Sequence, residues 1–178
     1  EEVRAAGGRP RIVQLTGATA APAIQAAAGE GAHAVVVACG SGLTLAGLAL
    51  GFKRLRREVR LIGISVQQPA ARLRPWIVEA AGQAAALAGI AERLSPDDFV
   101  LLDDQIGPGY GLPSPAGIEA VRLAGRTEAL VLDPVYTGKA LAGLAAARSA
   151  GVIGPGETVT FLHSGGTPGL FANAAAFA

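Results

Sequence analysis

The sequence lacks methionine altogether and has only one cysteine among its 178 residues. A single thiol, Cys39, excludes an internal disulfide and favours a reducing compartment, so we expect the protein in the cytoplasm. Charged residues are scarce at 16%, the net charge is +1, and no basic run is interleaved with aromatics, so no nucleic-acid partner is expected. No apolar run reaches the ~18 residues of a membrane span, so no membrane partner is expected either.

Hydrophobic residues make up 51% of the chain but aromatic residues only 4%, so the core must consist mostly of Ala, Val, Leu and Ile. Short apolar runs alternate with helical patterns, which predicts one α/β domain with a mostly parallel sheet and helices on both faces, in three layers. The predicted strands are Arg11–Leu15, Ala34–Ala38, Leu61–Val66, Phe99–Leu102, Ala129–Leu132 and Thr158–Leu162. The predicted helices are Ala21–Gly29, Leu43–Leu55, Pro69–Ala88, Pro115–Ala124, Thr137–Ala150 and a short one near Pro168–Ala175.

Ligands of such sheets bind beyond the carboxyl ends of the strands, so the segments after each strand are the ones to inspect. Glycine and hydroxyl or amide side chains gather in several of them, including "CGSGLT" from Cys39, "DDQIGPGYGLPSP" from Asp103 and "HSGGTPG" from His163. This clustering predicts a ligand site at one edge of the sheet.

The turn Gly40-Ser41-Gly42-Leu43-Thr44 lies between a predicted strand and a predicted helix. Glycine permits a tight turn, and the free N–H groups and positive dipole end of the following helix suit a phosphate. Ser41 and Thr44 add hydroxyl donors. The alternative is a simple strand-to-helix connection capped by Ser or Thr, and the turn alone does not separate the two.

Neither familiar nucleotide motif is satisfied. A dinucleotide fingerprint needs a glycine where Leu45 stands and an acidic residue near the end of the next strand, where Gln67 and Gln68 stand instead. In "DPVYTGKA", Asp133 takes the place of the first glycine of a nucleoside-triphosphate loop, and Ala140 takes the place of its magnesium-binding hydroxyl.

The remaining candidates each have a structural alternative. Tyr110 in "GPGYGLP" can act as a proton donor or stack on a planar ligand, or it can plug a Gly/Pro turn. Tyr136 can face a ligand or pack, and Asp133 and Thr137 can serve as helix caps. His163 and Cys39 are interpreted as structural, because no metal-ligand spacing surrounds the histidine and no base is spaced to activate the thiol. No metal site and no Ser-His-Asp arrangement is predicted, since the motif "GxSxG" is absent.

Four blocks in order, "GSGLTLAGLALG", "GYGLPS", "LDPVYTGKALAGL" and "FLHSGGTPGLF", resemble the pyridoxal-phosphate enzymes of the D-cysteine desulfhydrase and 1-aminocyclopropane-1-carboxylate deaminase family. The resemblance covers nearly the entire chain and implies a fold of the tryptophan-synthase-beta type. It implies pyridoxal phosphate as the cofactor and a small amino acid as the substrate.

The resemblance also implies site roles. It assigns the cofactor phosphate to residues 40–44, Tyr110 and Tyr136 to catalysis, and Thr137 and Ser164 to the pyridine nitrogen. The deaminase branch usually has Glu where Thr137 stands, and a hydroxyl there leaves the nitrogen largely neutral, which suffices for expelling a thiolate. The implied reaction is elimination from D-cysteine or a related amino acid to pyruvate, ammonia and sulfide. The alternative is the deaminase reaction.

Three departures from the family qualify that expectation. Leu43 stands where many relatives have glycine, and the segment Thr16–Gly31 is short. The lysine that binds the cofactor covalently lies in the amino-terminal half of this family, whereas the only lysines here are Lys53 and Lys139. We therefore expect the carboxyl-terminal part of a longer enzyme, inactive alone, with a homodimer or a missing amino-terminal segment completing it. The alternative is an inactive remnant that binds a phosphate ligand or a partner chain.

Overall fold

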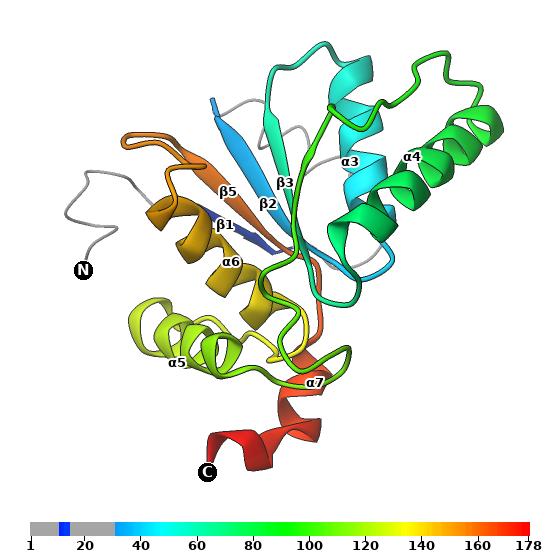
Figure 1. Cartoon of the computed structure of the whole chain (residues 1–178). Coiled ribbons are helices and arrows are strands. Elements are labelled where there is room, and N and C mark those ends of the chain that lie inside the picture. Colours follow the sequence, from blue (N-terminus) through cyan, green and yellow to red (C-terminus); the bar gives the residue numbers. More distant parts are fainter. Residues whose placement is uncertain (1–10, 15–30) are drawn as a thin grey trace.

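The computed structural model describes residues 11–14 and 31–178, and its centre is a five-stranded sheet (Figure 1). Every strand pairing is parallel, and the order across the sheet is β1-β5-β2-β3-β4. The strands are β1 (Arg11–Gln14), β2 (Ala34–Cys39), β3 (Arg60–Ser65), β4 (Val100–Leu102) and β5 (Val159–His163). The predicted parallel α/β sheet is thus confirmed, with β2 and β5 as neighbours.

Helices cover both faces of this sheet, which explains why its central strands are apolar throughout. The covering helices are α3 (Leu43–Arg54), α4 (Ala70–Leu87), α5 (Pro115–Glu128) and α6 (Thr137–Ser149). Figure 1 shows α3 and α4 on one side of the sheet and α5 and α6 on the other. Alternate residues of β2 belong to two different hydrophobic cores. Val35 and Val37 pack in the core with α3 and α4, whereas Ala34 and Val36 pack in the core with α5 and α6. The three-layer arrangement is confirmed.

The strand predicted over Ala129–Leu132 is wrong. Helix α5 continues past Ala124 to Glu128, and Ala129 then turns the chain in a left-handed conformation with φ 54°. Leu132 is fully buried in the core beside α5 and α6, so its apolar character reflects packing of an irregular segment and not a sheet ladder. The helix predicted over Ala21–Gly29 lies outside the described residues. The last predicted helix is present as α7 (Thr167–Ala172), followed by the 3-10 turn η1 (Ala174–Phe177).

Glycine allows α6 to approach its neighbours closely. A Cβ atom on Gly138 would lie 2.8 Å from the carbonyl oxygens of both Asp133 and Gly117 and 2.7 Å from Cγ2 of Val121. Since two of these atoms belong to the backbone, they cannot move aside as a flexible side chain would. The contact between α5 and α6 therefore requires glycine at this position.

We expect Gly138→Ala to destabilise the fold by roughly 1–3 kcal/mol, the range measured for overpacked cores. Gly47→Ala is the matched control, because Gly47 lies on the exposed side of α3 and an added Cβ would meet nothing within 4 Å. Replacing an exposed helical glycine by alanine should stabilise by about 0.5–1 kcal/mol. Urea unfolding followed by circular dichroism measures both changes, and equal midpoints for the two variants would contradict the packing argument.

Candidate functional site

The carboxyl ends of β2 and β5 meet at one edge of the sheet because these neighbouring strands are parallel. The turn after β2 begins at Gly40, and a Cβ on this residue would lie 3.3 Å from Cε1 of Tyr136. The turn after β5 contains Gly166, which closely approaches the carboxylate of Asp133. Three of the four motif blocks, separated along the sequence, therefore converge at this edge.

The turn that precedes α3 leaves several hydrogen-bond donors without partners among the described residues. Gly42 adopts a left-handed conformation with φ 79° and gives the helix no side-chain cap. The first helical bond runs from the Ala46 N–H to the Gly42 carbonyl, so the N–H groups of the first turn have no acceptor inside the helix. The hydroxyls of Ser41 and Thr44 are exposed and make no hydrogen bond within the described part of the chain. These donors suit a phosphate group.

Leu43, the residue that departs from the family pattern, lies in the first turn of α3. Its side chain is 57% exposed and so is not part of the core. No packing requirement among the described residues accounts for a leucine at this position.

The two tyrosines of the chain lie together. The Tyr110 hydroxyl hydrogen-bonds the Tyr136 hydroxyl, and their rings meet edge to face with centroids 6.0 Å apart and planes at 75°. The hydrogen bond that Tyr136 makes with Tyr110, together with burial and the nearby charge of Asp133, raises the pKa of Tyr136 to about 12. The Tyr136 phenol is therefore protonated at neutral pH and serves as a hydrogen-bond donor, not a base.

Asp133 organises the start of α6. Its buried carboxylate accepts hydrogen bonds from the N–H groups of Val135 at 2.8 Å, Tyr136 at 2.8 Å and Thr137 at 2.9 Å. The Thr137 hydroxyl donates to Oδ1 of the same carboxylate at 2.7 Å and accepts from the Asp133 N–H at 2.9 Å. The carboxylate is satisfied by these donors, which fix the backbone that carries Tyr136.

The two hydroxyls expected at the pyridine nitrogen differ in their surroundings. Thr137 is fully buried, and its single hydroxyl hydrogen is donated to Asp133. Ser164 is exposed, and its hydroxyl makes no hydrogen bond within the residues that the structure describes. Of the two, only Ser164 has a hydroxyl hydrogen available to a ligand.

His163 and Cys39 occupy structural positions, as the sequence indicated. The Gly165 N–H donates to Nδ1 of His163 at 3.3 Å, so Nε2 carries the proton and donates to the Val131 carbonyl at 3.0 Å. Cys39 is buried in the core on the α3 side, and burial raises the pKa of its thiol to about 12. A thiol in this state is not a nucleophile at neutral pH.

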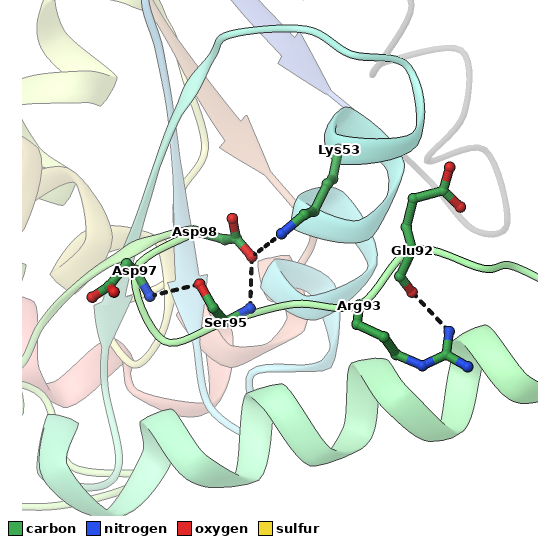
Figure 2. Close-up of polar contacts among 6 residues, drawn as sticks. All are labelled: Lys53, Glu92, Arg93, Ser95, Asp97 and Asp98. Carbon is green, nitrogen blue, oxygen red and sulfur yellow. Dashed lines mark hydrogen bonds and ion pairs between the residues drawn. The ribbon is translucent and has the colours of Figure 1, made fainter.

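Neither lysine lies free in the site. Figure 2 shows Lys53 near the far end of α3, where Nζ contacts the Asp98 carboxylate at 2.7 Å. Lys139 is fully buried in the first turn of α6, and Nζ donates to the carbonyls of Ile106 at 2.7 Å and Gly109 at 3.1 Å. A cavity of about 310 Å³ adjoins Lys53, at the opposite end of α3 from the phosphate turn, so it is separate from this site.

The sequence predicts the turn and the tyrosines as site residues, and the interpretation of Asp133 as a helix cap is confirmed. The structure adds one organising residue, Lys139, which the sequence indicates only as unsuited to hold the cofactor. Its sequence signal is a lone charge among small and apolar residues, "GKALAGL", where an exposed helix face would be polar.

Among residues 11–14 and 31–178, no helix is both long and apolar enough to cross a membrane. The same residues contain no group of three or more His, Cys, Asp or Glu side chains placed to hold a metal ion.

The sequence matches the family described as "Pyridoxal-phosphate dependent enzyme" over residues 3–165. D-cysteine desulfhydrase of Salmonella paratyphi C (strain RKS4594) is 39% identical over 181 residues, and the match covers 96% of this chain and 54% of the relative. D-cysteine desulfhydrase of Salmonella typhi is 38% identical with the same coverage. The chain thus spans about half the length of these curated relatives.

Solved structures share the fold. The "ACC deaminase homologue" aligns with a TM-score of 0.77 at 33% identity, covering 89% of this chain and 48% of that one. An L-serine ammonia-lyase from Rhizomucor miehei aligns with a TM-score of 0.56 at 17% identity, covering 89% of this chain and 54% of that one, and it supports the fold alone. The resemblance expected from the four sequence blocks is confirmed, as is a fold of the tryptophan-synthase-beta type. The chain belongs to the family of pyridoxal-phosphate-dependent enzymes.

Proposed function

We propose that this chain forms the phosphate-binding and pyridine-facing side of an enzyme that eliminates sulfide from D-cysteine or a related amino acid. The lysine that binds the cofactor covalently would come from outside this chain. The convergence of the Gly40 turn with Tyr136 carries the proposal, because a helix start suited to a phosphate lies next to a pair of proton-bearing phenols. The 39% identity to a D-cysteine desulfhydrase supports this choice of substrate.

The binding half of the site is made by the start of α3. Its free N–H groups and the hydroxyls of Ser41 and Thr44 would hold the cofactor phosphate, and Ser164 would approach the ring from the turn after β5. When bound, pyridoxal phosphate supplies an electron sink for negative charge at the amino acid's α-carbon. A neutral hydroxyl next to the ring nitrogen leaves that nitrogen largely unprotonated, so the ring withdraws electrons only moderately. This is sufficient when the leaving group is a thiolate.

The catalytic half is the tyrosine pair. The two phenols carry two hydrogens, and their mutual hydrogen bond uses one, so the other remains for the substrate. A donor held in this way can bind a substrate oxygen or sulfur or deliver a proton to a departing sulfur. In the overall reaction D-cysteine and water give pyruvate, ammonia and hydrogen sulfide.

Two other functions have an observation in their favour. The likeness to a solved "ACC deaminase homologue" at 33% identity favours a deaminase of the cyclopropane amino acid. The engagement of both lysines, Lys53 with Asp98 and Lys139 in the interior, favours a chain that binds a phosphate ligand without catalysis. A cytoplasmic location and a homodimer stay predictions.

Ser41→Ala and Thr44→Ala, each introduced into the complete protein, test whether the Gly40 turn binds the phosphate. Each variant removes one exposed hydroxyl without disturbing a contact in the described structure, so the fold should be unaffected. A hydrogen bond to a charged phosphate contributes roughly 1.5–3 kcal/mol, so the Kd for pyridoxal phosphate should rise about tenfold or more in each variant. Thr127→Ala is the control, because Thr127 is an exposed hydroxyl on α5. An unchanged Kd in both turn variants would place the phosphate elsewhere.

The absence of a usable lysine is tested on the 178-residue chain by adding pyridoxal phosphate and then borohydride. We expect no stoichiometric adduct on either lysine, because Nζ of Lys139 is buried and Nζ of Lys53 is paired with Asp98. Peptide mass spectrometry measures the result, and Lys53→Arg removes adventitious surface labelling. A stoichiometric adduct on Lys53 or Lys139 would show that the chain carries its own cofactor lysine.

The proposed reaction is tested by supplying the complete protein with D-cysteine and measuring sulfide and pyruvate. We expect both products in equal amounts, and a loss of kcat of about 10²- to 10⁴-fold in Tyr136→Phe, the usual contribution of a positioned acid. The 1-aminocyclopropane-1-carboxylate reaction, followed by release of 2-oxobutyrate, is the comparison. Faster turnover of the cyclopropane substrate would select the deaminase. Turnover of neither substrate would select the non-catalytic function.

A further inference from the structure

Lys139 is a charged residue in the interior, and its surroundings are unusual for an ammonium group. Its side chain is fully buried, and no carboxylate in the described part of the chain lies within ion-pair distance of Nζ. Nζ instead donates hydrogen bonds to the main-chain carbonyls of Ile106 at 2.7 Å and Gly109 at 3.1 Å. Burying a charge costs free energy unless the charge is hydrogen-bonded or paired. The hydrogen bonds to these two carbonyls therefore offset the cost of burying the ammonium group.

Both carbonyls belong to the loop between β4 and α5, which carries Tyr110. This loop has positive φ at Gly107, Gly109 and Gly111, with values of 66°, 146° and 79°. Glycine loses the most conformational entropy on folding, so such a loop needs external contacts to stay in one shape. Gly109 immediately precedes Tyr110, whose side chain is 53% exposed and so gains little from packing.

Lys139 lies in the first turn of α6, three residues after Tyr136. One helix start therefore holds Tyr136 through its own backbone and Tyr110 through the lysine. We propose that Lys139 is a positioning residue that fastens the Tyr110 loop, so that the Tyr110 hydroxyl stays bonded to the Tyr136 hydroxyl. The consequence for turnover rests on the function proposed above, whereas the placement of the tyrosines does not.

The charge state of Lys139 fits this role. Burial lowers the pKa of Lys139, and the attraction of the Asp133 carboxylate acts in the opposite direction. Asp133 thus helps Lys139 to remain an ammonium at neutral pH, with three N–H donors and no acceptor. The neutral amine that forms at higher pH still has two N–H groups, one for each of the two carbonyls. An apolar side chain of similar length would fill the space but leave the two carbonyls without a donor.

The two tyrosines are the only ones in the chain, which gives a direct measurement. In protein labelled with ¹³C at the tyrosine ζ-carbons, two signals report the ionisation of Tyr110 and Tyr136 separately. At a pH of about 10.5, a phenol with the ordinary pKa of about 10 is roughly three quarters ionised. Tyr136 of the wild-type protein, with its pKa of about 12, is almost fully neutral at that pH.

We expect Lys139→Met to release the loop, so that the pKa of Tyr136 falls and a larger fraction of Tyr136 is ionised at that pH than in the wild-type protein. Burial and the Asp133 charge remain in the variant, so they still raise this pKa in part. Tyr110→Phe should produce the same ionisation of Tyr136, because it removes the hydrogen bond directly. Lys53→Met is the matched control, since it removes the other lysine from the surface and should leave Tyr136 neutral. Far-UV circular dichroism confirms that each variant is folded. If Lys139→Met does not fold, Lys139→Gln, which is also uncharged, gives the same measurement.

Three outcomes separate positioning from a purely structural role. A folded Lys139→Met protein that is merely less stable, with Tyr136 no more ionised at a pH of about 10.5 than in the wild-type protein, would overturn the proposal. Ionised Tyr136 together with a kcat reduced about 10- to 100-fold and unchanged affinity for pyridoxal phosphate supports it. Ionised Tyr136 with unchanged kcat also supports the placement of Tyr110 by Lys139. That result would instead contradict the catalytic role proposed for the tyrosine pair.

Discussion

The buried carboxylate of Asp133 is the interaction on which the rest of the site depends. It satisfies three backbone N–H groups and the Thr137 hydroxyl at the start of α6, and it lies under the turn that contains Gly166. Removing it would leave several buried donors without partners, at a cost of about 1–3 kcal/mol for each unsatisfied group. The position of Tyr136, whose ring lies against the Gly40 turn, follows from this one cap.

The topology supplies the second constraint. Because β2 and β5 are parallel neighbours, the turns that follow them emerge at the same edge, although more than a hundred residues separate them in sequence. The shortage of large aromatic residues lets the helices lie close to the sheet, as where Gly143 of α6 meets the side chain of Ile64 in β3. Close layers bring the start of α6 up to the phosphate turn, so the composition of the core and the geometry of the site are linked.

Strand and helix patterns predicted most of the described fold, because fully buried parallel strands are continuous apolar runs between helical periods. The prediction failed at Ala129–Leu132, where an apolar run fills a core without joining a sheet, since periodicity reports burial and not pairing. In the site, the Gly40 turn and the two tyrosines have local signatures. The Asp133 cap is also local, because its partners lie within four residues of it. The role of Lys139 arises from contacts with Ile106 and Gly109, which are distant in sequence, and no local pattern encodes such contacts.

The surroundings of the two lysines indicate which part of the chemistry this chain's residues can perform. Lys53 is committed to an ion pair with Asp98, and Lys139 to two loop carbonyls in the interior. Since an amine must be deprotonated and accessible to attack a carbonyl carbon, neither is suited to covalent catalysis. What the described residues offer at the sheet edge is a set of hydrogen-bond donors, namely backbone N–H groups, the Ser41, Thr44 and Ser164 hydroxyls, and the phenol pair. Such a surface can bind an anion and place a proton, and under the proposed function the nucleophilic amine would come from outside this chain.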